Sequence, residues 1–310
     1  MRKSRSTLLK SLAVFLVAAV ALTSVIPINA EDDGDRTSDS ARVYPAYTFT
    51  DLSDGTVSVA QYAYDMANEW NEKYAGKPIP NGVWELLQEH SEQAGQLGAW
   101  LPPLIPAPRP VAPSRTSVLP VGTNGSFYSG TYKDEGWSGA WYGSHWELGD
   151  DATRKNRASC QIGSAGIIES WATTGEFIII SGSGSRNANI DIFGQAGALL
   201  FPSYFGVAGW IVFAEVWDVT GPTSILISAP PAIFSDATTY QHALTPGGYY
   251  HATIPVTLQA GRMYAVRVVT YTRVEEKTGT YPAPQCQVDA GKSLGSQYST
   301  TWSRIDINWR

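Results

Sequence analysis

Beyond about Gly122 the sequence consists largely of short apolar runs separated by turn residues, and in the strongest of these runs apolar and polar residues alternate. In the final run, Trp302–Arg310, the apolar Ile305, Ile307 and Trp309 alternate with polar residues, as in a strand with one face in water. The region shows no spacing of three and four residues that would indicate a helix. This pattern constrains residues 122–310 to an all-β domain.

Other segments of this region combine β-branched and aromatic residues between turn residues, as strands of a sandwich do. They are Ile167–Thr173, Phe177–Ser181, Asn189–Phe193, Trp210–Val219, Ser224–Ser228, Tyr249–Leu258 and Met263–Val274. Many short strands without interleaved helices predict a two-sheet antiparallel β-sandwich of the jelly-roll kind. A closed β-barrel is the alternative.

Two helices and a linker are predicted before this domain. Within residues 43–100, apolar residues recur at helical spacing up to Tyr74, where Gly76 and Pro78 follow, and a second such run begins after Asn81. The two runs predict a short helical hairpin. Residues 101–121 are predicted to be an extended linker, since they are rich in proline, which excludes helix and central strand.

The N-terminus predicts export. Basic residues up to Lys10 precede the apolar run Leu12–Leu22, and the small residue Ala30 follows at a position suited to cleavage. The run is too short to span a bilayer, which needs about 20 apolar residues, so residues 1–30 are predicted to be a signal peptide. Residues 31–42, EDDGDRTSDSAR, are predicted to be a flexible acidic leader. We therefore expect a secreted protein, extracellular or at the cell surface.

The charge disfavours two classes of partner. The formal net charge is −6, and it becomes −10 without residues 1–30, which hold four basic and no acidic residues. An acidic chain without Lys/Arg-rich runs does not suit nucleic acid or an anionic lipid surface. We expect no nucleic-acid partner and, after removal of the signal peptide, no stable membrane insertion.

The sequence contains two cysteines, Cys160 and Cys286. An even number in an exported chain favours a disulfide, which would close a long loop of the β domain. Neither cysteine has a histidine or a second cysteine at zinc-ligand spacing, so no metal site is predicted. No cofactor is predicted either.

A cluster of aromatic residues is the strongest candidate for a ligand site. Within residues 127–146, the rings of Trp137, Trp141, Tyr142 and Trp146 alternate with small and polar residues. Aromatic faces stack on the C–H faces of sugar rings, while polar neighbours bind the hydroxyl groups. These four residues are therefore predicted to bind glycan. The alternative is that the rings fill the core, as large aromatic residues commonly do.

Carboxylates on the predicted strands support a second hypothesis, hydrolysis of a polysaccharide. Glu169 and Glu215 are the candidate catalytic residues, because paired carboxylates perform glycoside hydrolysis. Glu215 lies in the apolar run WIVFAEVWDV, where burial would raise its pKa. The alternative is that Glu215 points outward from an antiparallel strand. Further carboxylates on these strands are Glu176, Asp191 and Asp218.

Three functions follow from these residues. The first is a secreted, non-catalytic recognition protein that binds a polysaccharide or cell-surface glycan through exposed aromatic residues. The second is a secreted polysaccharide hydrolase that uses paired carboxylates, and the third is a structural or adhesive component of the cell surface. Convergent carboxylates, exposed rings or an uncovered apolar edge strand would favour the hydrolase, the binding protein or the surface component, respectively.

Overall fold

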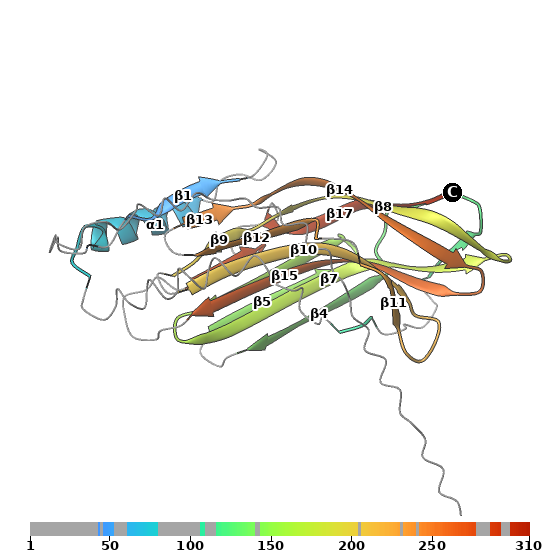
Figure 1. The fold of residues 1–310 in the computed structure, drawn as a ribbon, viewed down its shortest axis with the longest axis horizontal. Helices are drawn as coiled ribbons and strands as arrows, with labels where there is room; N and C mark the ends of the chain where they lie inside the picture. Colours follow the sequence, from blue (N-terminus) through green and yellow to red (C-terminus); the bar gives the residue numbers. More distant parts are fainter. Residues whose placement is uncertain are drawn as a thin grey trace, which may run out of the picture. The chain divides into compact units, whose positions relative to one another are not determined.

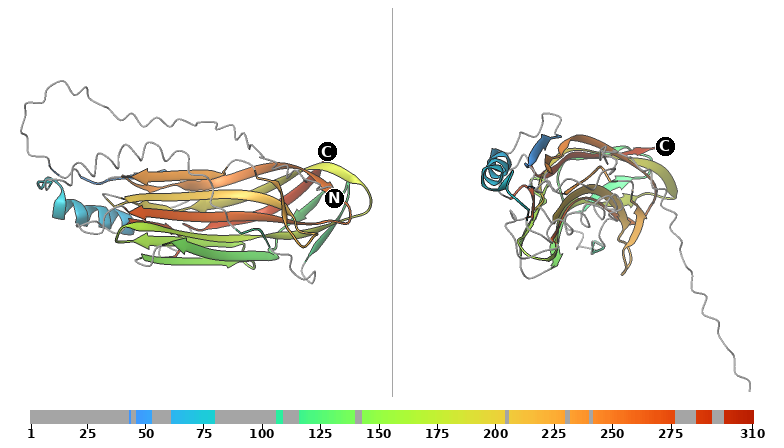
Figure 2. Two further views of the ribbon diagram at one scale, coloured as in Figure 1. Left: turned by 60° about the horizontal axis from the view of Figure 1, so that its bottom comes forward. Right: turned by 60° about the vertical axis from the view of Figure 1, so that its left-hand side comes forward.

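The computed structural model describes residues 43, 46–52, 61–79, 106–108, 116–139, 143–203, 206–229, 232–239, 242–276, 286–292 and 298–310. Within these ranges the chain forms one α-helix and seventeen β-strands. The strands make two sheets, one of them curled (Figure 1, Figure 2). The chain is therefore nearly all β, as the alternating pattern predicts.

The larger sheet has ten strands. Its main path runs β1, β13, β9, β16, β6, β17, β8, β14, while β3 pairs with β17 and β5 pairs with β6. The bounds are β1 (Thr48–Asp51), β3 (Gly125–Phe127), β5 (Gly143–Asp150), β6 (Lys155–Ile162), β8 (Ser185–Gly197), β9 (Leu199–Phe201), β13 (His242–Thr245), β14 (Gly247–Gln259), β16 (Cys286–Ala290) and β17 (Thr300–Trp309).

The smaller sheet has seven strands. Its main path runs β11, β10, β15, β7, β2, while β12 pairs with β10 and β4 pairs with β7. The bounds are β2 (Ser117–Pro120), β4 (Tyr132–Gly139), β7 (Gly166–Ser181), β10 (Gly206–Asp218), β11 (Ile225–Ser228), β12 (Phe234–Thr239) and β15 (Met263–Glu276). Neighbouring strands are antiparallel except in two pairs, β1 with β13 and β2 with β7.

One hydrophobic core joins the two sheets. On β10, Trp210 and Val212 point into it, and from the larger sheet Ile190, Trp302 and Ile305 do the same. Because side chains of a strand alternate between faces, the residues between these point away from the core. A core shared by two facing layers confirms the predicted sandwich.

The strand β7 differs from the prediction. The sequence predicts two strands, Ile167–Thr173 and Phe177–Ser181, whereas β7 is continuous over Gly166–Ser181. Gly175 is paired with Arg267 in the middle of the strand. A Cβ atom on Gly175 would lie 2.0 Å from the carbonyl oxygen of Val266, so this glycine permits a close approach of two strands instead of making a turn.

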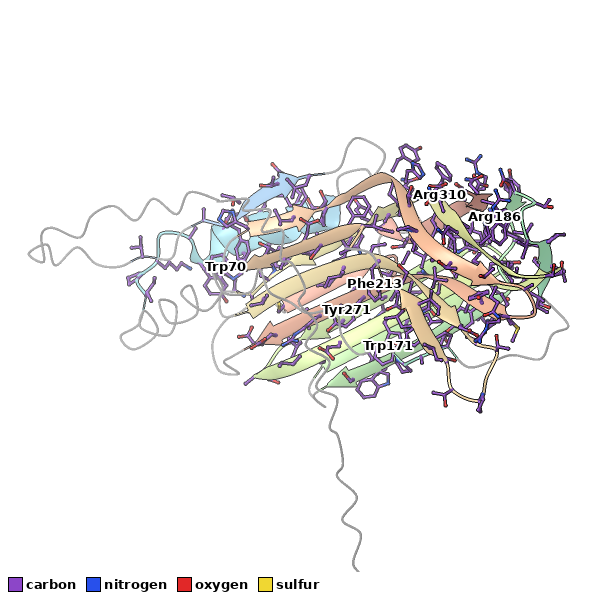
Figure 3. All side chains as sticks on the ribbon, turned by 45° about the vertical axis from the view of Figure 1, so that its right-hand side comes forward. Trp70, Trp171, Arg186, Phe213, Tyr271 and Arg310 are labelled. Atoms are coloured by element: carbon purple, nitrogen blue, oxygen red, sulfur yellow. The ribbon has the colours of Figure 1, made fainter. Side chains whose placement is uncertain are left out.

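A single helix, α1 (Gln61–Tyr74), lies among the described residues. It ends as predicted, with Gly76 at φ +77°. Trp70 of α1, labelled in Figure 3, packs edge-on against Tyr47 with 5.3 Å between ring centroids, and Tyr47 stacks on Phe201 of β9 with 5.2 Å between centroids. The second predicted helix lies outside the described residues, so the hairpin is not confirmed. Of the proline-rich residues 101–113, the structure describes Pro106–Pro108.

The predicted disulfide is wrong, because both cysteines are free and buried. They lie on the neighbouring strands β6 and β16, but Cys160 is opposite Val288 and Cys286 is opposite Ile162. This diagonal offset separates their Cα atoms by about 7 to 8 Å, beyond the reach of a disulfide. Each thiol donates a hydrogen bond instead, Cys160 to Thr272 Oγ1 and Cys286 to the carbonyl of Val207. Burial raises the pKa of Cys160 to about 12, which keeps this thiol protonated.

Candidate ligand-binding surface

Of the four aromatic residues predicted to bind glycan, the structure describes two, Trp137 and Trp146. Trp137 on β4 is 43% exposed and stacks on the ring of His145 on β5, with 3.8 Å between ring centroids. Because β4 and β5 belong to different sheets, this pair lies where the edges of the two layers meet. The side chain of Trp146 follows His145 on β5 and so points to the opposite face of that strand. Trp141 and Tyr142 lie outside the described residues.

Two other rings of residues 127–146 are part of the interior. Tyr132 is buried and packs edge-on against Phe177 at 5.2 Å, and Phe127 packs against the main core. These two rings therefore fill the interior, which was the alternative to ligand binding. Two described rings of this cluster are exposed to solvent, Trp137 and Tyr128, the latter at 57%.

The two candidate catalytic carboxylates share the outer face of the seven-stranded sheet but lie far apart. Glu215 on β10 is opposite Arg267, and Glu169 on β7 is opposite Arg273, six residues further along β15. Six residues of a strand correspond to about 20 Å. Two carboxylates that hydrolyse a glycosidic bond are about 5 to 10 Å apart. Glu169 and Glu215 therefore do not form such a pair.

Each of these carboxylates has protein partners. Glu215 accepts hydrogen bonds from Arg267 Nε at 2.7 Å and from Trp217 Nε1 at 2.8 Å. Glu169 accepts from the Tyr271 hydroxyl at 2.6 Å and the Ser138 hydroxyl at 2.8 Å. Glu215 thus points outward, as the alternative proposed, and it binds a buried arginine.

Glu176 is a buried carboxylate with a raised pKa. Its side chain is buried on the inner face of β7, where it accepts a hydrogen bond from Ser117. Burial raises the pKa to about 7, against the effect of hydrogen bonds from Ser117 and Thr131. The carboxyl group is therefore protonated in the folded protein at mildly acidic pH.

The raised pKa of Glu176 predicts a pH-dependent stability. In the unfolded chain its pKa is near 4.5, so the folded protein binds the proton more tightly. The stabilisation is fully present below pH 4.5 and is lost as the pH rises through about 7. We expect the Tm to fall over this window, and Glu176→Gln to flatten the fall. The exposed Glu69 of α1 supplies the control, Glu69→Gln, which should follow the wild type. Parallel pH profiles for Glu176→Gln and wild type would contradict the assignment.

A polar and aromatic surface covers the outer face of β8, β14 and β17, which we call the β8–β14–β17 face. Its side chains alternate with core residues on all three strands. They are Asn187, Asn189, Asp191, Phe193 and Gln195 of β8; Tyr249, His251, Thr253, Pro255 and Thr257 of β14; and Arg304, Asp306 and Asn308 of β17. These residues are exposed or half-buried. The face combines rings, amides, hydroxyls and charges.

Asp191 is the centre of the polar contacts on this face. It accepts hydrogen bonds from the hydroxyl of Thr253, from Asn308 Nδ2 at 2.9 Å and from His251 Nε2 at 3.0 Å. Partial burial by itself raises the pKa of Asp191, but the hydrogen bonds from Thr253, Asn308 and His251 outweigh it and the pKa lies below its usual value. Asp191 therefore remains ionised and holds side chains of β14 and β17 in place.

A stack of three side chains crosses the same strands. The ring of His251 stacks on Phe193 with 4.2 Å between centroids and 10° between planes. On Phe193, the guanidinium group of Arg304 lies 4.3 Å from the ring centroid, and Arg304 also binds Asp306 at 2.8 Å. Beside this stack, Tyr249 is 69% exposed. The face thus presents ordered rings next to ordered hydrogen-bonding groups, and its charges are largely paired with one another.

Sequence reasoning identified one residue of this face, Asp191, and missed His251, Phe193 and Arg304. The three strands that carry them are brought together by register: Phe193 is opposite His251 on one side and Arg304 on the other. A signal was nevertheless present. In Tyr249–Thr257 every second residue is polar or aromatic except Pro255, which indicates a strand that presents one face to solvent.

Among the described residues, the helix α1 is not long and apolar enough to cross a membrane. In the same residues, no group of three or more His, Cys, Asp or Glu side chains is arranged to hold a metal ion.

The fold and this surface define a two-sheet β-sandwich protein with an exposed polar and aromatic face. No family model matches the sequence, and no curated protein matches it. A search of solved structures finds similarity to the enzymatically active domain of tailspike protein 4 of bacteriophage CBA120, at 8% identity and a TM-score of 0.24, over 58% of this chain and 20% of that chain.

Two carbohydrate-binding modules are also similar. One, described as belonging to the β-sandwich superfamily, has 9% identity and a TM-score of 0.19 over 61% of this chain and 56% of its own. The other, the family 11 module of a cellulosomal cellulase of Clostridium thermocellum, has 11% identity and a TM-score of 0.16 over 61% of this chain and 89% of its own. This chain spans less than two thirds of the tailspike domain and of the superfamily module. Similarities this distant carry no argument about its function.

Proposed function

We propose that this protein is a secreted glycan-binding protein and that the β8–β14–β17 face is its binding surface. The observation that carries the proposal is the stack of His251, Phe193 and Arg304 beside the hydrogen-bonded Asp191. Sugar recognition needs ring faces for the C–H side of the sugar and fixed polar groups for its hydroxyls. Both kinds of group are present on three adjacent strands and are held by protein contacts before any ligand binds.

The pairing of charges points to the class of glycan. Arg304 is paired with Asp306, and Asp191 is satisfied by three donors, so the centre of the face offers little unpaired charge. An uncharged polysaccharide suits such a surface better than a sulfated or uronic one. The signal peptide predicted at residues 1–30 supports a location outside the cell, where polysaccharide is accessible.

Trp137 remains a second proposed contact for the same function. Its indole is exposed and one of its faces is covered by His145, so the other face is available for stacking. It lies at the meeting edge of the sheets and not on the β8–β14–β17 face. Substitutions can therefore test the two surfaces independently.

The test is binding to a panel of neutral polysaccharides, measured by pull-down and by isothermal calorimetry on any polysaccharide retained. We expect the double variant Tyr249→Ala/His251→Ala to bind at least about ten-fold more weakly than wild type, because interface aromatic residues commonly contribute that much. Tyr64→Ala, which removes an exposed tyrosine of α1 outside both surfaces, is the matched control and should bind normally. Trp137→Ala reports on the second surface.

Circular dichroism of each variant checks that the fold is retained. Wild-type binding that survives the double substitution would remove the β8–β14–β17 face from the proposal. Loss only in Trp137→Ala would transfer the function to the edge of the sheets. Absence of binding by wild type to every polysaccharide and to a glycan array would overturn the proposed function itself.

A further inference from the structure

An open groove lies at one end of the β8–β14–β17 face. Its volume is about 440 Å³, within the range of small-ligand sites. Asn187 and Thr257, which belong to the face, form part of its wall together with Arg310. The groove is therefore continuous with the surface that we propose to bind glycan.

The rest of the groove is apolar and comes from both sheets. Val256 of β14 is a core residue, and Pro255 next to it is exposed. The opposite wall is Ile227 of β11, which belongs to the seven-stranded sheet. The groove thus opens where the edges of the two layers part, and it brings the margin of the hydrophobic core into contact with solvent.

The polar rim of the groove is fixed by hydrogen bonds. Thr257 Oγ1 donates to Asn187 Oδ1 at 2.8 Å, which orients the amide so that its Nδ2 donors point away from Thr257. The backbone N–H of Arg310 donates to the carbonyl of Asn187. Oriented polar groups on one side and an apolar wall on the other suit an amphipathic ligand.

The strand β11, which supplies the apolar wall of the groove, exposes three consecutive apolar side chains to solvent. On β11, Ile225, Leu226 and Ile227 are 57%, 44% and 40% exposed. Adjacent exposed apolar side chains on an edge strand usually mark a contact surface. Leu226 is opposite Trp217, whose side chain points away from the core. Ile227 lines the groove, so these two neighbours belong to different surfaces of the protein.

We propose that the groove binds a sugar unit that carries a small apolar substituent, such as an O-acetyl group, on the glycan held by the β8–β14–β17 face. The substituent contacts Ile227, Pro255 and Val256, while the hydroxyls of the same unit bind Asn187 and Thr257. The groove lies about 20 Å along β14 from His251, six residues away, so the glycan spans several units. This inference rests on the proposed function and adds a preference for acylated polymer.

The experiment compares one polysaccharide before and after mild alkaline de-O-acetylation. Wild type is expected to bind the acetylated polymer about three- to ten-fold more tightly, the effect of burying one or two methyl-sized groups. Ile227→Asn should bind both forms equally, with the affinity of wild type for the deacetylated form. Leu226→Asn is the matched control, since it changes a similarly exposed residue of the same strand outside the groove, and it should keep the preference.

The outcomes separate the two proposals. Equal binding of both polymers by wild type, with binding still lost in Tyr249→Ala/His251→Ala, overturns the groove and leaves the face. A preference retained in Ile227→Asn, or lost equally in Leu226→Asn, also overturns it. If wild type is a dimer by light scattering and both β11 variants are monomers, the apolar edge binds a second copy of this chain, and the groove proposal fails. Binding of no polysaccharide at all overturns both.

Discussion

Replacing Arg267 by alanine is expected to lower the free energy of unfolding by about 3 to 5 kcal/mol, as removal of one partner from a buried ion pair commonly does. The Arg267 side chain is fully buried on the outer face of the seven-stranded sheet. Its guanidinium group donates to Glu215 at 2.7 Å and to the carbonyl of Pro106 at 2.8 Å, and it lies 5.2 Å from the ring centroid of Trp217. Alanine would leave the Glu215 carboxylate without its cation.

Arg262→Ala is the control for this prediction. Arg262 Nη1 lies 2.5 Å from Asp218 Oδ2, but the Arg262 side chain is exposed, so the loss of stability should be clearly smaller than that of Arg267→Ala. Urea unfolding followed by tryptophan fluorescence measures both variants. Equal stabilities for the two would mean that the Arg267–Glu215 pair is not the structural element that we describe. The expected difference would also assign Glu215 a structural role in place of the catalytic one predicted from its apolar neighbourhood.

Trp302→Ala is expected to have an effect of similar size, about 3 to 5 kcal/mol. Trp302 of β17 is fully buried in the main core. Its indole Nε1 donates to Thr174 Oγ1 of β7 at 3.1 Å, so one side chain joins the ten-stranded sheet to the seven-stranded sheet. Alanine leaves a cavity between the layers and removes this hydrogen bond.

Two companion variants divide that effect into its parts. Trp302→Phe keeps most of the ring and loses the hydrogen bond, with an expected cost of about 1 to 2 kcal/mol. Trp309→Ala, at a partly buried position of the same strand, should cost less than Trp302→Ala. Thermal and urea unfolding supply the comparison. A Trp302→Ala variant as stable as Trp309→Ala would contradict the role of Trp302 between the sheets.

The alternation of residues was sufficient to predict the class of fold but not how the strands pair. Ile305 and Ile307 of β17 point into the core as their spacing indicates. The sequence could not show that β7 continues through Gly175, because a glycine that permits close strand contact resembles one that makes a turn. The jelly-roll character of the strand order remains a prediction.

Register decided the features that sequence reasoning missed. A shift of two residues between β6 and β16 is enough to keep Cys160 and Cys286 apart. Likewise His251 and Asp191 are sixty residues apart in the chain, yet His251 Nε2 lies 3.0 Å from Asp191 Oδ1 in the structure. Composition identifies such side chains as polar residues on strands, but only the pairing of β8 with β14 makes them neighbours.

The place of β17 has a consequence for the moment at which this protein can fold. In the ten-stranded sheet β17 lies between β6 and β8, yet it is the last strand in the sequence. Until residues 300–309 have left the ribosome, β8 and β14 cannot be joined to the rest of that sheet. Among the described strands, β17 is therefore the one that completes the ten-stranded sheet, after all the strands that it joins have been synthesised.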